Sequence, residues 1–290
     1  MKAYVFPGQG AQFAGMASTL YEHGLAKDLF AQANQILGFD ILSVMLEGSD
    51  EDLRQTRITQ PAIFLHSVIS ARISDQFSPQ AVAGHSLGEF SALVASGAMS
   101  FEDGLNLVYI RAMAMQKACD LNPGTMAAIV GMEDAIVEKV CADTLGIVVA
   151  ANYNCPGQLV ISGEIEAVET AMHTLKEMGC RNAIRLPVGG AFHSPLMAVA
   201  ERELKEGIAA TILKVPLCPI YQNIDAIPHT DPDEIRTNLL LQLTGPVRWS
   251  QTIQHMIKDD ISEFVEVGGN GKVLSGLIKK VDRKIAVSSI

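Results

Sequence analysis

A short run of residues that could do chemistry lies in the first third of the chain, where Gly84-His85-Ser86-Leu87-Gly88 interrupts small apolar residues. The pattern Gly-x-Ser-x-Gly is typical of a sharp turn from a strand into a helix, with the serine hydroxyl exposed at the turn. The free N–H groups and the dipole at the start of that helix favour a negative oxygen that develops nearby. The motif therefore predicts that Ser86 is a nucleophile, although a structural serine between two packing glycines fits the same pattern.

A serine nucleophile needs a neighbouring base, because the free hydroxyl is unreactive at neutral pH. His193 is the best candidate among the seven histidines. It follows Gly189-Gly190 and precedes Ser194-Pro195, so it lies in a loop that we expect to face a cleft between two domains. His66, in an apolar helical segment, and His173, in an amphipathic one, fit core and surface positions instead.

A single arginine marks a second candidate site. The predicted helix over 104–116 carries apolar residues on every side, and Arg111 is its only charged residue. A capping-box-like Ser100-Phe101-Glu102-Asp103 precedes it. A helix that is apolar all round is normally buried, so the guanidinium needs an anion beside it. That anion is either a carboxylate of this chain or a group that arrives with the substrate and is held bidentately.

Composition restricts the class of protein. The 290 residues are 48% hydrophobic and 19% charged, which is enough to bury a large core. The net charge of −10 argues against a nucleic-acid partner, which would require clustered lysine and arginine. Neither a signal peptide nor an apolar run long enough to cross a membrane is visible, so we expect a cytoplasmic protein. The five cysteines form no C-x-x-C pair and the histidines lack metal-ligand spacing, so no disulfide framework, metal or cofactor is expected.

Two other glycine-rich segments resemble nucleotide-binding loops only in part. In residues 8–13, Phe13 occupies the position where a dinucleotide-binding loop needs a small residue. In the loop 268–272, Val273 follows the lysine and replaces the Ser or Thr that would bind magnesium in a phosphate loop. Binding of NAD or ATP is therefore not expected.

The spacing of apolar residues predicts the elements that position these side chains. We expect a buried strand at 2–6 and a helix over 61–77 that begins at its proline. A strand at 81–86 should then turn into a helix over 87–96, which places Ser86 at the turn.

The central part of the chain has a different pattern. Between 125 and 188 the predicted order is strand, helix, two strands, helix and strand, which is the ferredoxin-like β-α-β-β-α-β unit. We therefore expect a ferredoxin-like small domain at 122–189. It would be inserted into a large α/β-hydrolase-like domain with a parallel sheet core, formed by 1–121 and 190–290.

Taken together, these features resemble one family, the malonyl-CoA:acyl carrier protein transacylases of fatty acid synthesis, which are related to the acyltransferase domains of polyketide synthases. The matching segments follow in order along nearly the whole chain: FPGQGAQ (6–12), TQPAIF (59–64), GHSLGEFSAL (84–93), RAMAMQ (111–116), NYNCPGQLVISG (152–163), GAFHSPLM (190–197), GPVRWSQTI (245–253) and EVGGNGKVLSGLIKK (266–280). One departure is the loop 268–271, which is a residue longer than the usual Gly-Pro-Gly-Lys turn of the family and lacks its proline.

The resemblance implies a role for each matching residue. Ser86 is then the nucleophile, His193 is its base, and Arg111 holds the free carboxylate of a malonyl group. Gln9 and the backbone N–H of Leu87 form the oxyanion hole.

Four further positions follow from the same resemblance. A backbone carbonyl near Gln242, rather than an acid, orients the histidine, and His85 and Asn154 line the cleft. Phe192, in the sequence GAFH, fills space that an α-methyl group would need and so favours malonyl over methylmalonyl. One methyl group is worth only about 1–3 kcal/mol of discrimination.

The implied reaction is transfer of malonyl from malonyl-CoA to the phosphopantetheine thiol of acyl carrier protein through a malonyl-serine ester. We expect a monomer that docks the acidic carrier protein on its basic run, Lys279, Lys280, Arg283 and Lys284. Two other functions remain as alternatives, a serine esterase or phospholipase-type hydrolase and a non-catalytic scaffold of the same fold. Arg111 disfavours the hydrolase, and the presence of all three candidate residues disfavours the scaffold. The sequence does not separate a fatty acid pathway from a polyketide pathway.

Overall fold

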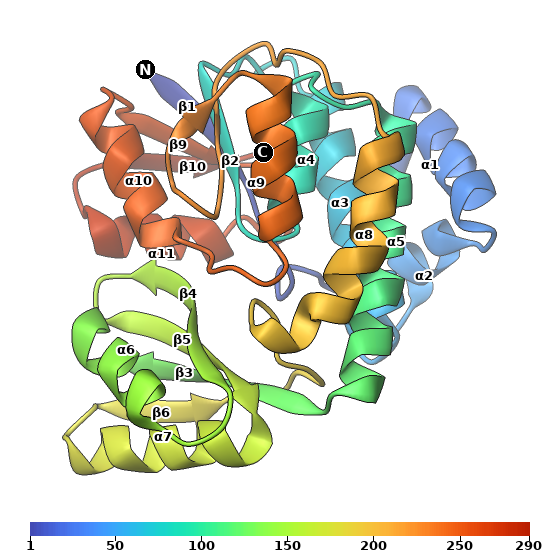
Figure 1. The fold of residues 1–290 in the computed structure, drawn as a ribbon. Helices are drawn as coiled ribbons and strands as arrows, with labels where there is room; N and C mark the ends of the chain where they lie inside the picture. Colours follow the sequence, from blue (N-terminus) through green and yellow to red (C-terminus); the bar gives the residue numbers. More distant parts are fainter.

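The computed structural model describes all 290 residues, which form a larger upper part and a smaller lower part in Figure 1. The larger part is built around a six-stranded sheet with the strand order β10-β9-β1-β2-β7-β8. Five of its strands are parallel, and β8 (Pro228–His229) pairs antiparallel with β7 at one edge. The parallel strands are β1 (Lys2–Phe6), β2 (Ala81–Gly84), β7 (Ile220–Tyr221), β9 (Glu263–Glu266) and β10 (Ala286–Ser289).

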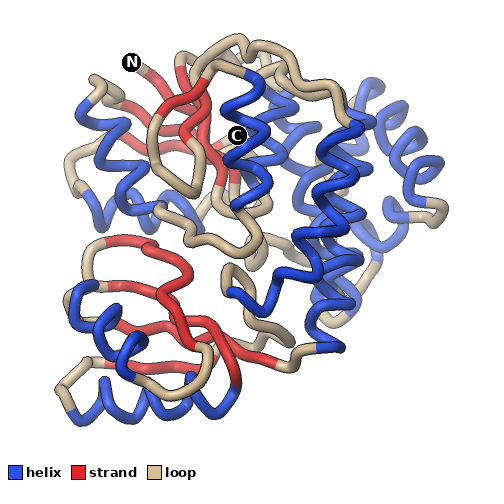
Figure 2. Tube along the Cα trace, in the orientation of Figure 1, coloured by secondary structure: helices blue, strands red, loops and turns tan.

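Helices cover both faces of this sheet, as Figure 2 shows. They are α1 (Gly24–Leu37), α2 (Ile41–Glu47), α3 (Thr56–Ile73), α4 (Gly88–Ala95), α5 (Phe101–Leu121), α8 (Ala198–Ala210), α9 (Pro232–Leu241), α10 (Trp249–Lys258) and α11 (Val273–Val281). Side chains alternate along β1, so Tyr4 and Phe6 pack into a core of 53 buried residues that includes α3, α4 and α5. Ala3 and Val5 point to the other face of the sheet, where they pack in a second core with residues of α10 and α11. A parallel sheet is normally buried on both faces in this way.

The register of the sheet brings two loops together. Phe6 at the end of β1 lies opposite Gly84 at the end of β2. Because the two strands are parallel, the residues that follow them, 7–9 and 85–87, emerge at the same edge of the sheet. Ligands of open α/β sheets bind at the carboxyl ends of such strands.

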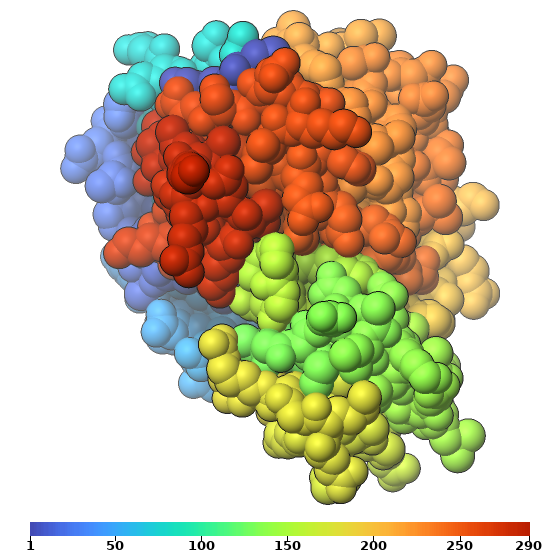
Figure 3. All heavy atoms as spheres, turned by 90° about the vertical axis from the view of Figure 1, so that its left-hand side faces the viewer, coloured from blue at the N-terminus to red at the C-terminus, as the bar shows by residue number.

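The smaller part contains a separate four-stranded antiparallel sheet with the order β4-β5-β3-β6. Its elements are β3 (Gly124–Val130), α6 (Asp134–Asp143), β4 (Val148–Cys155), β5 (Gln158–Glu164), α7 (Ile165–Glu177) and β6 (Asn182–Arg185). The predicted order of strands and helices is therefore confirmed. This part has its own core of 15 buried residues and forms a distinct lobe at the bottom of the space-filling view (Figure 3).

The two parts contact each other through β4. The Tyr153 N–H donates to the Val247 carbonyl at 2.8 Å, and the Val247 N–H donates to the Ala151 carbonyl at 2.8 Å. These bonds extend β4 onto the loop that precedes α10.

Two helix predictions were wrong in detail. The helix predicted to begin at Pro61 begins at Thr56, with the proline inside it, and ends at Ile73. Near a helix start a proline removes only one backbone bond, here the one to the Arg57 carbonyl, so the extra turn is tolerated. The helix α5 also exposes one face, which includes Met113, so it is not buried on every side. Arg111 lies on its buried face.

All five cysteines are buried, and none of them forms a disulfide. None of the helices is by itself long and apolar enough to cross a lipid bilayer, and only α1 and α2 counted together, across a 120° bend, reach that length and hydropathy.

Candidate active site

Ser86 occupies the sharp turn that the sequence predicts. It follows β2, precedes α4 and has a φ of 53°, a left-handed conformation that costs a non-glycine residue about 1–3 kcal/mol. A Cβ at Gly84 would lie 1.9 Å from the Gly88 carbonyl carbon, and a Cβ at Gly88 would lie 2.0 Å from the Phe6 oxygen. Both glycines are therefore needed for β1, β2 and α4 to approach this closely.

His193 lies directly against the serine. Its Nε2 is 2.7 Å from Ser86 Oγ, and its Nδ1 is 2.9 Å from the Gln242 carbonyl oxygen and 3.1 Å from that of Gly245. Carbonyl oxygens only accept hydrogen bonds, so Nδ1 carries the proton and Nε2 is free to take one. Backbone carbonyls thus occupy the place that an acidic residue has in other serine triads.

The environment keeps this histidine neutral. Burial, and after it the positive charge of Arg111, lowers the pKa of His193 to about 3. A neutral imidazole is the form that a general base requires. The arrangement of Ser86 and His193 is therefore that of an activated nucleophile at neutral pH.

The rate at which Ser86 reacts is expected to stay constant as the pH is lowered, until the pH is well below the ordinary histidine pKa of about 6.5. Protonation of His193 removes the base, so reactivity should fall only as the pH drops towards the lowered pKa. The rate of labelling of Ser86 by a fluorophosphonate, measured against pH, checks this without requiring a particular acyl donor. Burial raises the pKa of Glu89 to about 7, so the profile is compared with that of Glu89→Gln. A limb near 6.5 that persists in this variant would contradict the assignment.

Arg111 is buried, with 1% of its surface exposed, and has no carboxylate partner. Its Nη1 donates to Gln60 Oε1 at 2.8 Å, its Nη2 donates to Ser86 Oγ at 2.9 Å, and its Nε has no acceptor. Burial lowers the pKa of this guanidinium to about 10, so it remains charged at neutral pH. Of the two alternatives for its anion, an internal ion pair in direct contact is absent. The buried carboxylate of Glu89 lies near enough for its charge to oppose part of this lowering of the pKa. A buried cation beside a nucleophile is suited to an anionic substrate.

Two backbone N–H groups are free to bind an oxyanion. The N–H of Ser86 donates to Asn223 Oδ1 at 2.6 Å and is therefore occupied. The N–H groups of Gln9 and Leu87 donate to no acceptor in the chain, and both residues line the cavity at the serine. The shared edge of β1 and β2 is what brings Gln9 and Leu87 together.

The cavity around the serine is small, with a volume of about 120 Å³. Most of the residues predicted from the sequence line it, namely Gln9, His85, Ser86, Leu87, Arg111, Phe192 and His193. Gln242 lies behind them, with its side-chain Nε2 donating to the Ser86 carbonyl at 3.1 Å. Asn154 does not line the cavity as predicted. It lies further along β4 and contacts His85 Nε2 through Oδ1 at 2.9 Å, while Asn152 of the same strand lines the cavity instead.

Two polar residues of the site, Gln60 and Asn223, were not among those predicted from the sequence. Gln60 lies in the matching segment 59–64 and holds the guanidinium of Arg111, but nothing in the sequence links the two positions. Asn223 belongs to no motif, and its contact with Ser86 joins residues that are 137 positions apart.

The basic run lies at the exposed end of α11. Two of its four basic side chains form hydrogen bonds within the chain. Lys279 Nζ donates to the Ile285 carbonyl at 2.6 Å, and Lys280 Nζ donates to Gln158 Oε1 of the smaller part at 2.9 Å. Arg283 and Lys284 have no side-chain partner, so their charges face solvent.

Comparisons with known proteins show the family of this chain. The family model for the acyl transferase domain matches residues 3–290. The malonyl CoA-acyl carrier protein transacylase of Bacillus subtilis (strain 168) is 41% identical over 294 aligned residues, which cover 99% of this chain and 92% of that protein.

Solved structures give the same result. The crystal structure of an acyl carrier protein S-malonyltransferase from Vibrio cholerae has a TM-score of 0.95 and 39% identity, covering 100% of this chain and 96% of the other. A malonyl-transacylase solved in complex with AntF, a type II polyketide acyl carrier protein, has a TM-score of 0.95 and 34% identity, with 100% and 95% coverage. The family expected from the motifs is confirmed: this chain belongs to the malonyl-CoA:acyl carrier protein transacylases, within the acyl transferase family.

Proposed function

We propose that this chain transfers the malonyl group of malonyl-CoA to the phosphopantetheine thiol of an acyl carrier protein and so supplies fatty acid synthesis. The observation that carries the proposal is the unpaired guanidinium of Arg111, whose Nη2 lies 2.9 Å from Ser86 Oγ. In a malonyl thioester a single methylene separates the carboxylate from the reacting carbonyl. A carboxylate held by Arg111 therefore brings that carbonyl to the serine, and the small cavity suits so short an acyl group.

In the first half-reaction Ser86 Oγ attacks the thioester carbonyl while His193 Nε2 takes its proton. The N–H groups of Gln9 and Leu87 hold the negative oxygen of the tetrahedral intermediate. The carbon–sulfur bond then breaks, and His193 returns the proton to the sulfur, so that coenzyme A leaves as a thiol. A malonyl ester of Ser86 remains.

The second half-reaction reverses these steps with a new thiol. His193 takes the proton of the phosphopantetheine thiol, the sulfur attacks the ester carbonyl, and Ser86 leaves with the proton returned by His193. Every group that this scheme uses is a side chain or backbone N–H of the chain, so we propose that it requires no metal or cofactor.

Steady-state kinetics test the proposal. With malonyl-CoA and carrier protein both varied, a covalent intermediate predicts parallel lines in double-reciprocal plots. Intersecting lines would contradict the ester intermediate. Steady release of coenzyme A without carrier protein would show that water is the acceptor, as in a hydrolase.

Phe192→Ala should relax the choice of acyl group. Phe192 is buried and lines the cavity, and we propose that its ring fills the space that an α-methyl substituent would need. The preference for malonyl-CoA over methylmalonyl-CoA should fall by about 5–100-fold, which corresponds to the usual contribution of one methyl group. The ratio of the two kcat/KM values measures this, with Phe192→Leu as the control that retains a bulky side chain. An unchanged ratio in Phe192→Ala would remove Phe192 from the selectivity.

A surface groove offers a path for the thioester arm. It shares Gln9, Leu186 and Val188 with the cavity and continues outward past Gly10 and Arg54. Coenzyme A and the carrier protein present the same phosphopantetheine arm, so the acyl donor and the acyl acceptor can use one path. The basic side chains of Lys279, Lys280, Arg283 and Lys284 are our candidates for the docking surface of the acidic carrier protein. The amines of Lys279 and Lys280 are hydrogen-bonded within the chain, whereas the side chains of Arg283 and Lys284 are exposed.

The organisation of the chain fits this function. The strand order and connections of residues 124–185 support a ferredoxin-like domain at 122–189, inserted into an α/β-hydrolase-like domain of 1–121 and 190–290. The cavity is lined by both, since Asn152 and Met126 come from the inserted part. The unpaired cysteines suit a reducing compartment, and we propose a cytoplasmic monomer.

A further inference from the structure

The strained turn at Ser86 is held by one asparagine that the reaction scheme does not use. Asn223 is buried, with 1% of its surface exposed, and its side chain bridges the turn. Its Oδ1 accepts the Ser86 N–H at 2.6 Å, and its Nδ2 donates to the Gly84 carbonyl at 2.5 Å. One amide group therefore fixes the backbone N–H of the nucleophile itself and the carbonyl two residues earlier.

Asn223 is held in turn by a buried carboxylate. Glu89 lies three residues after Ser86 on α4 and is fully buried. Its Oε2 accepts the backbone N–H of Asn223 at 2.7 Å, and its Oε1 accepts from Gln222 Nε2 at 3.2 Å. A side chain of α4, the helix that follows the nucleophile, is thus hydrogen-bonded to the loop that carries Asn223.

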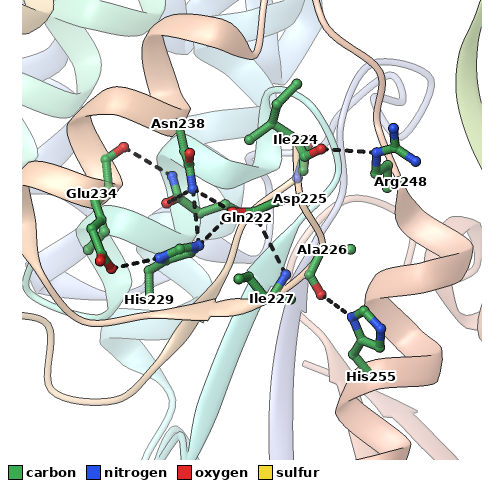
Figure 4. Close-up of polar contacts among 12 residues, drawn as sticks. Gln222, Ile224, Asp225, Ala226, Ile227, His229, Glu234, Asn238, Arg248 and His255 are labelled. Carbon is green, nitrogen blue, oxygen red and sulfur yellow. Dashed lines mark hydrogen bonds and ion pairs between the residues drawn. The ribbon is translucent and has the colours of Figure 1, made fainter.

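The loop is anchored at its far end by a polar cluster between the β7–β8 hairpin and α9, drawn in Figure 4. Asn238 Nδ2 donates to Gln222 Oε1 at 3.2 Å and to Asp225 Oδ2 at 2.9 Å. His229 lies between two carboxylates, 2.8 Å from Asp225 Oδ2 and 3.0 Å from Glu234 Oε2. Because α9 ends at Leu241, directly before the carbonyl of Gln242 that orients His193, the hairpin and α9 support both members of the catalytic pair.

We propose that Asn223 is a positioning residue for the nucleophile and that Glu89 holds it in place. By accepting the Ser86 N–H, Asn223 keeps that donor out of the oxyanion hole and leaves the next N–H, that of Leu87, directed at the cavity. It also maintains the left-handed backbone conformation of Ser86, in which Ser86 Oγ is within hydrogen-bond distance of His193 Nε2. An asparagine is required because the turn offers one donor and one acceptor, which neither aspartate nor alanine satisfies together.

The inference rests on the proposed function only in taking Ser86 as the nucleophile. Asn223→Ala should lower kcat for malonyl transfer by about 10–100-fold, because the serine and the oxyanion N–H lose their alignment. The KM for malonyl-CoA should change by less than about threefold, since Arg111 is untouched and uniform binding is retained. Labelling of Ser86 by a fluorophosphonate, which requires no particular acyl donor, should slow to the same extent as kcat.

Two further variants keep the test decisive. Glu89→Gln retains the shape of the side chain but only one acceptor oxygen, so it should show the same pattern with a smaller loss and tests the inference if Asn223→Ala does not fold. Asn34→Ala is the matched control, because Asn34 also bridges two segments, donating to Asp40 Oδ1 at 2.8 Å and accepting from the Ile41 N–H at 3.0 Å, but on the remote turn between α1 and α2. It should leave kcat and labelling unchanged.

The results separate this role from a merely structural one. Unchanged kcat and labelling in a folded Asn223→Ala variant, with only a lower Tm, would overturn the inference, as would an equal loss in Asn34→Ala. If the wild-type protein is labelled at Ser86 but transfers no malonyl group, the proposed function fails, while the effect of Asn223 on labelling still tests the positioning role.

Discussion

Replacing Ser86 with alanine is expected to abolish the acyl-enzyme and to lower kcat by about 10⁴-fold or more. The serine is the only hydroxyl that contacts His193 Nε2, so its removal leaves the reaction without a nucleophile. The substrate carboxylate can still bind Arg111, which the change does not remove. Loss of turnover should therefore be accompanied by retained binding of malonyl-CoA, measured by isothermal titration calorimetry.

A second variant, Ser86→Gly, controls for backbone strain at this position. Ser86 has a positive φ, in which alanine is strained, whereas glycine adopts it freely. Ser86→Gly should therefore be equally inactive and keep a Tm closer to that of the unchanged protein. Appreciable malonyl transfer by either variant would show that another group is the nucleophile.

Arg111→Ala is expected to reverse the choice of acyl donor. The guanidinium is buried with no carboxylate in contact, so a malonyl carboxylate supplies its missing partner, and losing one side of such a pair costs about 2–5 kcal/mol. The kcat/KM for malonyl-CoA should fall by about 10²–10³-fold, while that for acetyl-CoA should change by less than about tenfold. Parallel assays with the two thioesters give the ratio.

Arg111→Lys is the informative companion. It retains a positive charge but cannot contact a carboxylate with two parallel donors or hold Gln60 and Ser86 at once. It should therefore recover only part of the malonyl activity. Equal losses with malonyl-CoA and acetyl-CoA in Arg111→Ala would show that the arginine supports the site rather than the substrate carboxylate.

Local motifs were sufficient to predict those parts of the site whose residues lie close together in the sequence. The strand, turn and helix around Ser86 follow from two glycines whose absence of Cβ the packing requires. The order of elements in 124–185 follows from clear alternation and helical periodicity. The start of α3 was mispredicted because Pro61 favours a helix start but is also tolerated one turn later.

Contacts between distant segments could not be predicted from spacing. The choice between the two anions for Arg111 depended on whether any carboxylate packs beside α5, which only the tertiary structure decides. The role of Asn223 could not be predicted for the same reason, because nothing in the local sequence of this loop residue indicates that it contacts the turn at Ser86. The resemblance implies that Asn154 lines the cleft, whereas in the structure it contacts His85 and Asn152 of the same strand lines the cavity.

We propose that a malonyl group is carried on Ser86 and is selected by its carboxylate. Intact-mass spectrometry of the protein mixed briefly with malonyl-CoA or acetyl-CoA, without carrier protein, tests both parts at once. We expect a malonyl adduct that maps to Ser86, little acetyl adduct, and discharge of the adduct when carrier protein is added. Steady release of coenzyme A with no adduct, or no adduct and no release, would contradict a malonyl-serine intermediate.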